Sequence, residues 1–241
     1  SDLNLPGDQN KLIETVLEIN PNTIIVLNTG SPIRMPWIDK AKTVLQSWYP
    51  GQEFGNALVD VITGDANPSG KLPTSFPKNI EDTPAFSSYP GKDLQMNYEE
   101  ELLVGYKWYE RKNIKPLFPF GHGLSYTKFK YSNLKIIDMD DGGYQCEYDI
   151  KNIGGLPGSE ISQCYVVTNV NNEIEPIKKL QGFNKVYLAP GEQKRIQIIL
   201  SERSFSVWST NNKDWIMQSG SHQILIGASS EDIQLSSKVN L

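Results

Sequence analysis

The chain has 241 residues, of which 38% are apolar and 21% charged, and its formal net charge is −5. Such a chain can bury a substantial core, which excludes wholesale disorder, and its acidic balance argues against a nucleic-acid partner. No apolar run approaches the roughly 20 residues of a membrane-spanning helix, so no membrane partner is expected either.

The first half of the chain has the pattern of α/β structure. Apolar residues at helical spacing predict helices over 12–20 and 54–63, and Gly64 is suited to cap the second one. The apolar run 23–27 predicts a strand that is covered on both faces, and 43–49 predicts a second strand of the same kind.

Two parallel strands are too few for a complete domain of this class, because they cannot form a sheet with helices on both faces and a closed core. We therefore expect the α/β domain to be incomplete, either as a fragment or as one piece of a larger assembly.

A stretch dense in aromatic residues joins the two halves. It contains Tyr98, Tyr106, Trp108, Tyr109, Phe118, Phe120, Tyr126 and Phe129. The simpler interpretation is an interdomain seam packed with large side chains, and the alternative is a platform on which sugar rings stack. A seam that borders a cleft can serve both purposes.

From about Tyr131 the apolar period falls to two, which indicates an all-β domain. Turn sequences such as 154–158 and 189–192 separate about seven short strands. We place these strands near Leu134, Tyr148, Tyr165, Val186, Ile198, Trp215 and Leu225. The regular spacing favours an antiparallel sandwich, and the absence of a Cys-Trp-Cys arrangement favours the fibronectin type over the immunoglobulin type.

The residues that carry nucleophilic or metal chemistry form no recognisable motif. There is no GxSxG elbow, Walker loop, HExxH or CxxC, so neither a metal nor a cofactor is expected. His122 can act as an acid or base, but it is more simply explained as part of a tight turn, and His222 opens the last strand. Cys146 and Cys164 fall at strand positions where small buried side chains are expected.

The carboxylates also have structural explanations. Glu53 opens a helix, Asp65 lies in a turn, and the charge run 99–101 is typical of a solvated face. No carboxylate pair has the spacing of an acid and a nucleophile. Taken by itself, the sequence therefore contains no catalytic centre.

A series of motifs, in order along the whole chain, resembles the C-terminal half of glycoside hydrolase family 3, the β-glucosidase family. In the first half these are Leu5-Pro6-Gly7-Asp8-Gln9, Leu27-Asn28-Thr29-Gly30-Ser31-Pro32, Trp48-Tyr49-Pro50-Gly51-Gln52-Glu53-Phe54-Gly55-Asn56-Ala57, Asn67-Pro68-Ser69-Gly70-Lys71-Leu72-Pro73, Gly105-Tyr106-Lys107-Trp108-Tyr109 and Phe118-Pro119-Phe120-Gly121-His122-Gly123-Leu124-Ser125-Tyr126. In the second half, Leu180-Gln181-Gly182-Phe183, Leu188-Ala189-Pro190-Gly191 and Gly227-Ala228-Ser229-Ser230 resemble the family's fibronectin-like domain.

The resemblance implies a retaining glycosidase that removes terminal β-linked sugars, usually glucose. In that family the nucleophile is an Asp on a preceding TIM-type barrel, and the acid/base is a Glu just upstream of the Leu-Pro-Gly-x-Gln segment. Only residues 1–4 precede that segment here, and none is Glu. Both catalytic carboxylates are thus expected upstream of residue 1, and the chain alone is expected to be inactive.

The resemblance further implies a fold of an incomplete α/β sandwich domain over 1–127 and a fibronectin type III-like β-sandwich over 128–241. The expected partners are the N-terminal, barrel-containing half of the same enzyme and a β-glucoside or oligosaccharide substrate. The loop 87–101 is a candidate wall of the substrate cleft, and Tyr98 is its candidate sugar-binding residue. The alternative is a remnant that binds carbohydrate or a partner without catalysis. No Asn-x-Ser/Thr acceptor free of proline occurs, so a cytoplasmic location is the default expectation.

Overall fold

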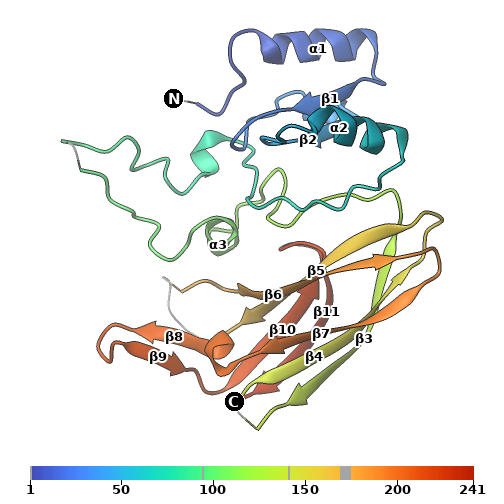
Figure 1. Ribbon diagram of the computed structural model, residues 1–241. Coiled ribbons are helices and arrows are strands. Elements are labelled where there is room, and N and C mark those ends of the chain that lie inside the picture. Colours follow the sequence, from blue (N-terminus) through green and yellow to red (C-terminus); the bar gives the residue numbers. More distant parts are fainter. Residues whose placement is uncertain (1, 94, 141, 169–174) are drawn as a thin grey trace.

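The computed structural model describes residues 2–93, 95–140, 142–168 and 175–241. Figure 1 shows two parts, one above the other, with the short helix α3 between them. The upper part contains α1 (Gln9–Ile19), β1 (Ile24–Leu27), η1 (Ile38–Lys40), β2 (Thr43–Gln46), α2 (Phe54–Thr63) and η2 (Ile80–Asp82), and α3 (Tyr106–Arg111) follows at the junction with the lower part. The lower part consists almost wholly of strands.

The α/β part is built on β1 and β2, which pair in parallel with Ile25 opposite Val44. Its small core holds Leu5, Leu17, Ile25, Leu27, Ile33, Met35, Trp37 and Phe76. Trp37 is only 1% exposed, and its indole nitrogen donates a hydrogen bond of 2.9 Å to Asn10. The predicted helix 54–63 is confirmed, and Gly64 ends it with a φ of 86°, which a side chain would disfavour.

Two expectations for this part were wrong. The second strand ends at Gln46 rather than at Tyr49, because Trp48 adopts a φ of 53° that no strand accommodates. The first strand is not covered on both faces within this chain: Ile25 and Leu27 are buried, but Ile24 is exposed.

The lower part is a sandwich of two antiparallel sheets. The three-stranded sheet has the order β3 (Phe129–Asp138), β4 (Tyr144–Asn152) and β7 (Gln193–Leu200). The four-stranded sheet has the order β11 (Ile233–Asn240), β10 (Ser221–Gly227), β5 (Gly158–Val167) and β6 (Lys179–Leu188). The two antiparallel sheets confirm the predicted fibronectin-type sandwich, and on β7 buried residues alternate with exposed ones, as in a strand with one face on the core.

The core of the sandwich contains both cysteines. Cys146 on β4 and Cys164 on β5 are fully buried free thiols that contact each other across the two sheets. This contact, followed by burial, raises the pKa of the Cys164 thiol. The expectation of small buried residues is confirmed.

Two strands of the second half, 206–209 and 233–240, were not predicted, and the predicted strand near Trp215 was wrongly assigned to the sandwich. The strand near Trp215 is β9 (Asp214–Met217), which pairs with β8 (Ser206–Ser209) in a separate hairpin after η3 (Glu202–Phe205). The hairpin projects from the end of the sandwich in Figure 1. The missing seventh strand of the sandwich is β11, so His222 lies in the penultimate strand, β10, and not in the last one.

The two parts share buried contacts. Tyr106 stacks on Phe120 at a centroid distance of 5.0 Å and meets the ring of Tyr165 edge-on at 5.9 Å. The side chain of Gln163 on β5 donates a hydrogen bond of 3.2 Å to the carbonyl of Gly121. For these residues the seam interpretation of the aromatic stretch is confirmed.

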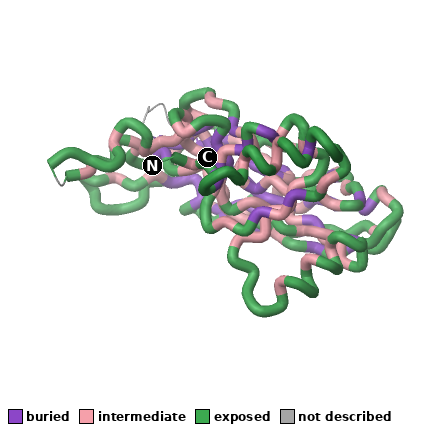
Figure 2. Tube along the Cα trace, turned by 90° about the horizontal axis from the view of Figure 1, so that it is seen from above, coloured by how far each residue is buried: buried purple, intermediate pink, exposed green. Residues whose placement is uncertain are grey.

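Figure 2 shows the buried residues gathered along the middle of the molecule, with exposed loops around them. Among the described residues, no helix is both long enough and apolar enough to cross a lipid bilayer.

Candidate functional site

The loop between η2 and α3 carries the predicted sugar-binding residue. It extends away from both parts of the molecule in Figure 1, and Leu94 within it lies outside the described residues. At its base, the indole nitrogen of Trp108 donates a hydrogen bond of 3.1 Å to the carbonyl of Asp82. Farther out, the Ser87 hydroxyl donates one of 3.2 Å to Glu99.

Tyr98 lies on this loop with 73% of its surface exposed. Phe86 and Tyr89 are exposed on the same loop. Exposed aromatic rings this large contribute little to a core, so they are available to contact a ligand or another part of a larger protein. The structure does not bring Tyr98 to the cavity at the seam.

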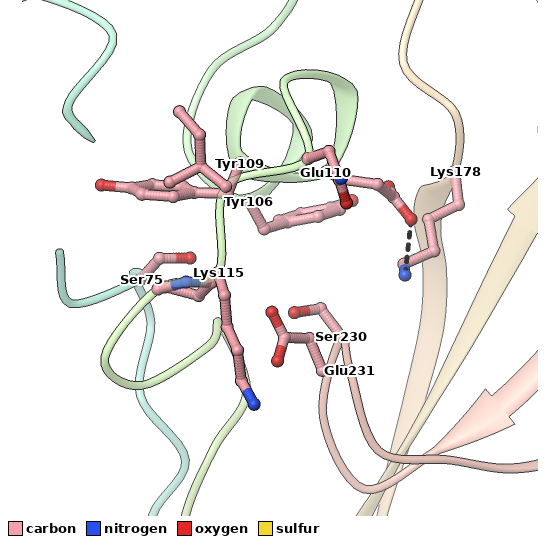
Figure 3. Close-up of a pocket in the computed structure, with 11 residues that line it drawn as sticks. Ser75, Tyr106, Tyr109, Glu110, Lys115, Lys178, Ser230 and Glu231 are labelled. Carbon is pink, nitrogen blue, oxygen red and sulfur yellow. Dashed lines mark ion pairs between the residues drawn. The ribbon is translucent and has the colours of Figure 1, made fainter. Parts of the chain in front are cut away.

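That cavity lies between the two parts and has a volume of about 310 Å³. Figure 3 shows its walls: Tyr106, Tyr109 and Glu110 come from α3, whereas Lys178, Ser230 and Glu231 come from loops of the sandwich. Ser75 and Lys115 complete it from the α/β side. The motif that starts α3 and the loop before β11 thus meet here although they are far apart in sequence.

An ion pair dominates the electrostatics of the cavity. Lys178 lies 2.7 Å from Glu110, and both side chains are mostly buried. The second carboxylate oxygen of Glu110 is buried and has no hydrogen-bond partner among the described residues. Figure 3 shows Glu110 turned toward Lys178, so this carboxylate is engaged in holding the two parts together.

The tyrosines of the cavity are held in the neutral form. The Tyr106 hydroxyl accepts a hydrogen bond of 2.8 Å from the Leu180 amide, but burial dominates and raises its pKa to about 12. Burial also raises the pKa of Tyr109 to about 12. Neither phenol is suited to act as a base near neutral pH, since a catalytic group needs a pKa close to the working pH.

The other candidate residues have structural surroundings. The His122 ring stacks on Phe118 at 5.2 Å, and burial, with a smaller contribution from Lys71, lowers its pKa. His222 is 1% exposed and packs against Phe205. Asp65 accepts a hydrogen bond of 2.7 Å from Thr63 after the end of α2.

Glu53 lies at the start of α2 and accepts a hydrogen bond of 2.7 Å from Asn56. Of the carboxylates at 99–101, Glu99 and Glu101 are exposed, whereas one oxygen of Glu100 is buried without a hydrogen-bond partner in the described part of the chain. Across the described ranges, no group of three or more His, Cys, Asp or Glu residues is placed to hold a metal.

The described residues therefore form a buried seam between the two parts and an exposed aromatic loop. They do not form a recognisable pair of a catalytic acid and a nucleophile. The Glu110–Lys178 pair escaped prediction, because its partners are 68 positions apart and nothing in the local sequence links them.

Comparison with family models assigns both parts of the chain. Residues 1–126 match the glycosyl hydrolase family 3 C-terminal domain, and residues 160–230 match a fibronectin type III-like domain.

Comparison with curated proteins finds enzymes much longer than this chain. Thermostable beta-glucosidase B of Acetivibrio thermocellus is 46% identical over 99% of this chain and 32% of its own length. Beta-glucosidase BoGH3A of Bacteroides ovatus is 39% identical over 95% of this chain and 32% of its own length. The chain thus spans about a third of the length of these relatives.

Solved structures agree over the whole chain. DesR, a beta-glucosidase from Streptomyces venezuelae in complex with D-glucose, superposes with a TM-score of 0.94 at 42% identity, covering 100% of this chain and 31% of that structure. A beta-glucosidase from Kluyveromyces marxianus in complex with glucose superposes with a TM-score of 0.95 at 37% identity, covering 100% of this chain and 29% of that structure.

Proposed function

The chain belongs to glycosyl hydrolase family 3, and from this membership we propose that it is the C-terminal portion of a retaining β-glucosidase. The observation that carries the proposal is the match over the whole chain to beta-glucosidases, including one solved with D-glucose. The substrate is a β-glucoside or oligosaccharide with a terminal non-reducing β-D-glucosyl residue.

Within that enzyme, this chain supplies structure rather than the reacting groups. Retention requires two carboxyl groups roughly 5–5.5 Å apart across the glycosidic bond. Glu53, Asp65 and Glu110 are held by structural partners, and on our proposal the nucleophile and the acid/base lie on the remainder of the enzyme. The chain alone is inactive on this proposal.

The exposed surface of the α/β part supports an intramolecular partner. Apolar side chains are exposed on α1, β1 and α2, namely Leu12, Ile19, Ile24, Val59 and Ile62. A two-stranded parallel sheet is also marginal by itself. The N-terminal, barrel-containing part of the same enzyme covers this surface on our proposal and completes the sheet.

We assign residues 1–127 to the α/β domain and residues 128–241 to the fibronectin-like domain. The first strand of the sandwich begins at Phe129, which supports a boundary just before it.

Activity assays on the complete protein test this proposal. We expect the complete protein to hydrolyse p-nitrophenyl β-D-glucoside and the 241-residue chain to show no turnover. Proton NMR of the first product formed should show the β-anomer of glucose. An initial α-anomer would contradict retention, and sugar binding without turnover by the complete protein would favour the non-catalytic alternative.

The same proposal makes Tyr98 a substrate contact. Aromatic faces pack against the apolar faces of sugar rings, and Tyr98 is the most exposed tyrosine of the loop. We expect Tyr98→Ala in the complete enzyme to raise KM about threefold to tenfold, which corresponds to the order of 1 kcal/mol for an aromatic contact.

Tyr187→Ala is the matched control, because Tyr187 is also exposed but lies on β6 of the sandwich. Unchanged KM and kcat in Tyr98→Ala would remove Tyr98 from the substrate site without affecting the assignment of the reaction.

A further inference from the structure

A second hollow, of about 440 Å³, lies beside the β8–β9 hairpin. Its lining combines aromatic and charged residues: Trp208 and Trp215 from the hairpin, Arg203 from η3, Glu175 and Lys179 from the entry to β6, and Lys107 from α3. Both parts of the chain therefore contribute to it.

The two tryptophans form one wall. They are paired across the hairpin, and their rings meet edge-on at a centroid distance of 5.7 Å. Trp208 remains 48% exposed and Trp215 remains 39% exposed, although the hairpin belongs to neither sheet of the sandwich. Packing within the chain does not account for so much exposed indole surface.

The charged residues that line the hollow are mostly cationic. Among the described residues that line it, Glu175 is the single carboxylate, and it lies 3.2 Å from Lys179. Neither Lys107 nor Arg203 has a carboxylate within ion-pair distance in the described part of the chain; Arg203 instead stacks on the Trp215 ring at 4.3 Å. The described lining of the hollow thus carries three cations against one anion.

Lys107 carries the clearest sign of an uncompensated charge. Burial, followed by the nearby Lys179, lowers its pKa, and Glu175 opposes this only in part. A partly buried ammonium without a partner is unfavourable, and an anion bound beside it would relieve that cost.

We propose that this hollow binds an acidic sugar, with the pyranose ring against the indole of Trp208 and the carboxylate among the cations Lys107, Lys179 and Arg203. An exposed indole face suits a sugar ring, and ammonium and guanidinium groups suit a carboxylate. A hexuronic acid residue combines both features in one unit. The inference goes beyond the proposed β-glucosidase reaction, because that reaction needs no anionic group on its substrate.

Ligand-observed NMR titrations of the complete protein test the site with D-glucuronate, D-glucose and acetate as probes. We expect glucuronate to bind at least about tenfold more tightly than either of the others, since each lacks one of the two recognition features. Binding of glucuronate should also weaken as salt rises, because the cations lie near the surface. Equal binding of glucose would overturn the role of charge, and equal binding of acetate would reduce the hollow to a general anion site; either result overturns the proposal.

Variants locate the binding. Trp208→Ala should lower glucuronate affinity about tenfold or more, and Lys107→Gln should lower it while removing part of its salt dependence. Lys238→Gln is the control, because Lys238 is exposed on β11. Hydrolysis of p-nitrophenyl β-D-glucoside should stay unchanged in all three variants. Undiminished glucuronate binding in both Trp208→Ala and Lys107→Gln would place the ligand elsewhere and refute the site.

Discussion

Glu160 shows how one side chain can join the two parts of the chain. It lies on β5, accepts a hydrogen bond of 2.8 Å from the Tyr131 hydroxyl and forms an ion pair of 3.3 Å with Lys71 of the α/β part. The Glu160 and Lys71 side chains are only 7% and 12% exposed. Removing one member of such a pair leaves the other charge in a poorly solvated place.

We therefore expect Glu160→Ala to lower the free energy of unfolding by about 3–5 kcal/mol, as measured by urea denaturation of the complete protein. Glu18→Ala is the control, because Glu18 and Lys40 form an ion pair of 3.2 Å that is exposed to solvent. The control should change stability by less than about 1 kcal/mol. Similar effects in the two variants would mean that burial does not strengthen the Lys71 pair.

The raised pKa of Tyr106 predicts that the free energy of unfolding falls at alkaline pH. Its pKa is raised to about 12 by burial, whereas an unfolded tyrosine titrates near 10. Below pH 10 both states keep the proton, so Tyr106 adds no pH dependence. Between pH 10 and 12 the unfolded state loses the proton first, so the free energy of unfolding falls as pH rises, by up to about 1.4 kcal/mol per pH unit for this one group.

Urea denaturation at a series of pH values measures this slope. Tyr106→Phe should be less stable at pH 8, because the Leu180 amide loses its partner, but its stability should fall less steeply between pH 10 and 12. Other buried tyrosines, such as Tyr109, will keep part of the slope. An identical slope in the variant and the parent would contradict the assignment to Tyr106.

At the scale of elements, two segments of the α/β part form an irregular ribbon beside the seam. Leu72 donates a hydrogen bond of 2.8 Å to the carbonyl of His122, and Phe76 donates one of 2.8 Å to Phe118. Gly123 lies where the two segments come closest, since a Cβ there would meet the carbonyl oxygen of Gly70 at 2.1 Å. The ribbon can close only if position 123 has no side chain.

Gly123→Ala should therefore cost about 1–3 kcal/mol of stability, because the backbone must move to admit the methyl group. The midpoint of urea denaturation measures this cost. Gly155→Ala is the control: a Cβ at Gly155 meets nothing within 4 Å, and its backbone is not left-handed. Equal midpoints for Gly123→Ala and the parent would show that the ribbon is looser than described.

The elements also show what the sequence could and could not predict. α1, α2 and six strands of the sandwich follow from apolar periodicity and turn residues. β11 was missed because the polar Ser237 lies on its inward face between Leu235 and Val239, and Val239 is the one buried residue of the strand. Trp215 suggested a core strand, but its cross-strand partner is Trp208 in a separate hairpin, and no local pattern specifies which distant strand a segment joins.

The candidate site was less predictable than the fold. Tyr98 and the loop could be singled out from aromatic residues, but whether Tyr98 contacts substrate stays a prediction. The seam cavity and the hollow beside the hairpin arise from segments such as 106–111 and 175–179, which meet only after folding. The family, by contrast, was correctly predicted from motifs in order along the chain.

At the scale of the whole molecule, the seam predicts that the two parts unfold together. It contains the Lys71–Glu160 and Glu110–Lys178 ion pairs and the stacked rings of Tyr106 and Phe120. Opening it would expose these groups before either core is lost.

We expect a single transition in urea for the complete protein, with coincident midpoints by far-ultraviolet circular dichroism and by tryptophan fluorescence, to which Trp37 and Trp48 of the α/β part contribute. Two separated transitions would mean that the seam couples the parts weakly. Glu160→Ala should then leave the later transition unchanged.

The buried contact between Cys146 and Cys164 makes the opening of the sandwich measurable. Because neither thiol is accessible while the two sheets stay together, an alkylating reagent can reach them only when the sandwich opens. The rate of their modification at high reagent concentration is then the rate of that opening.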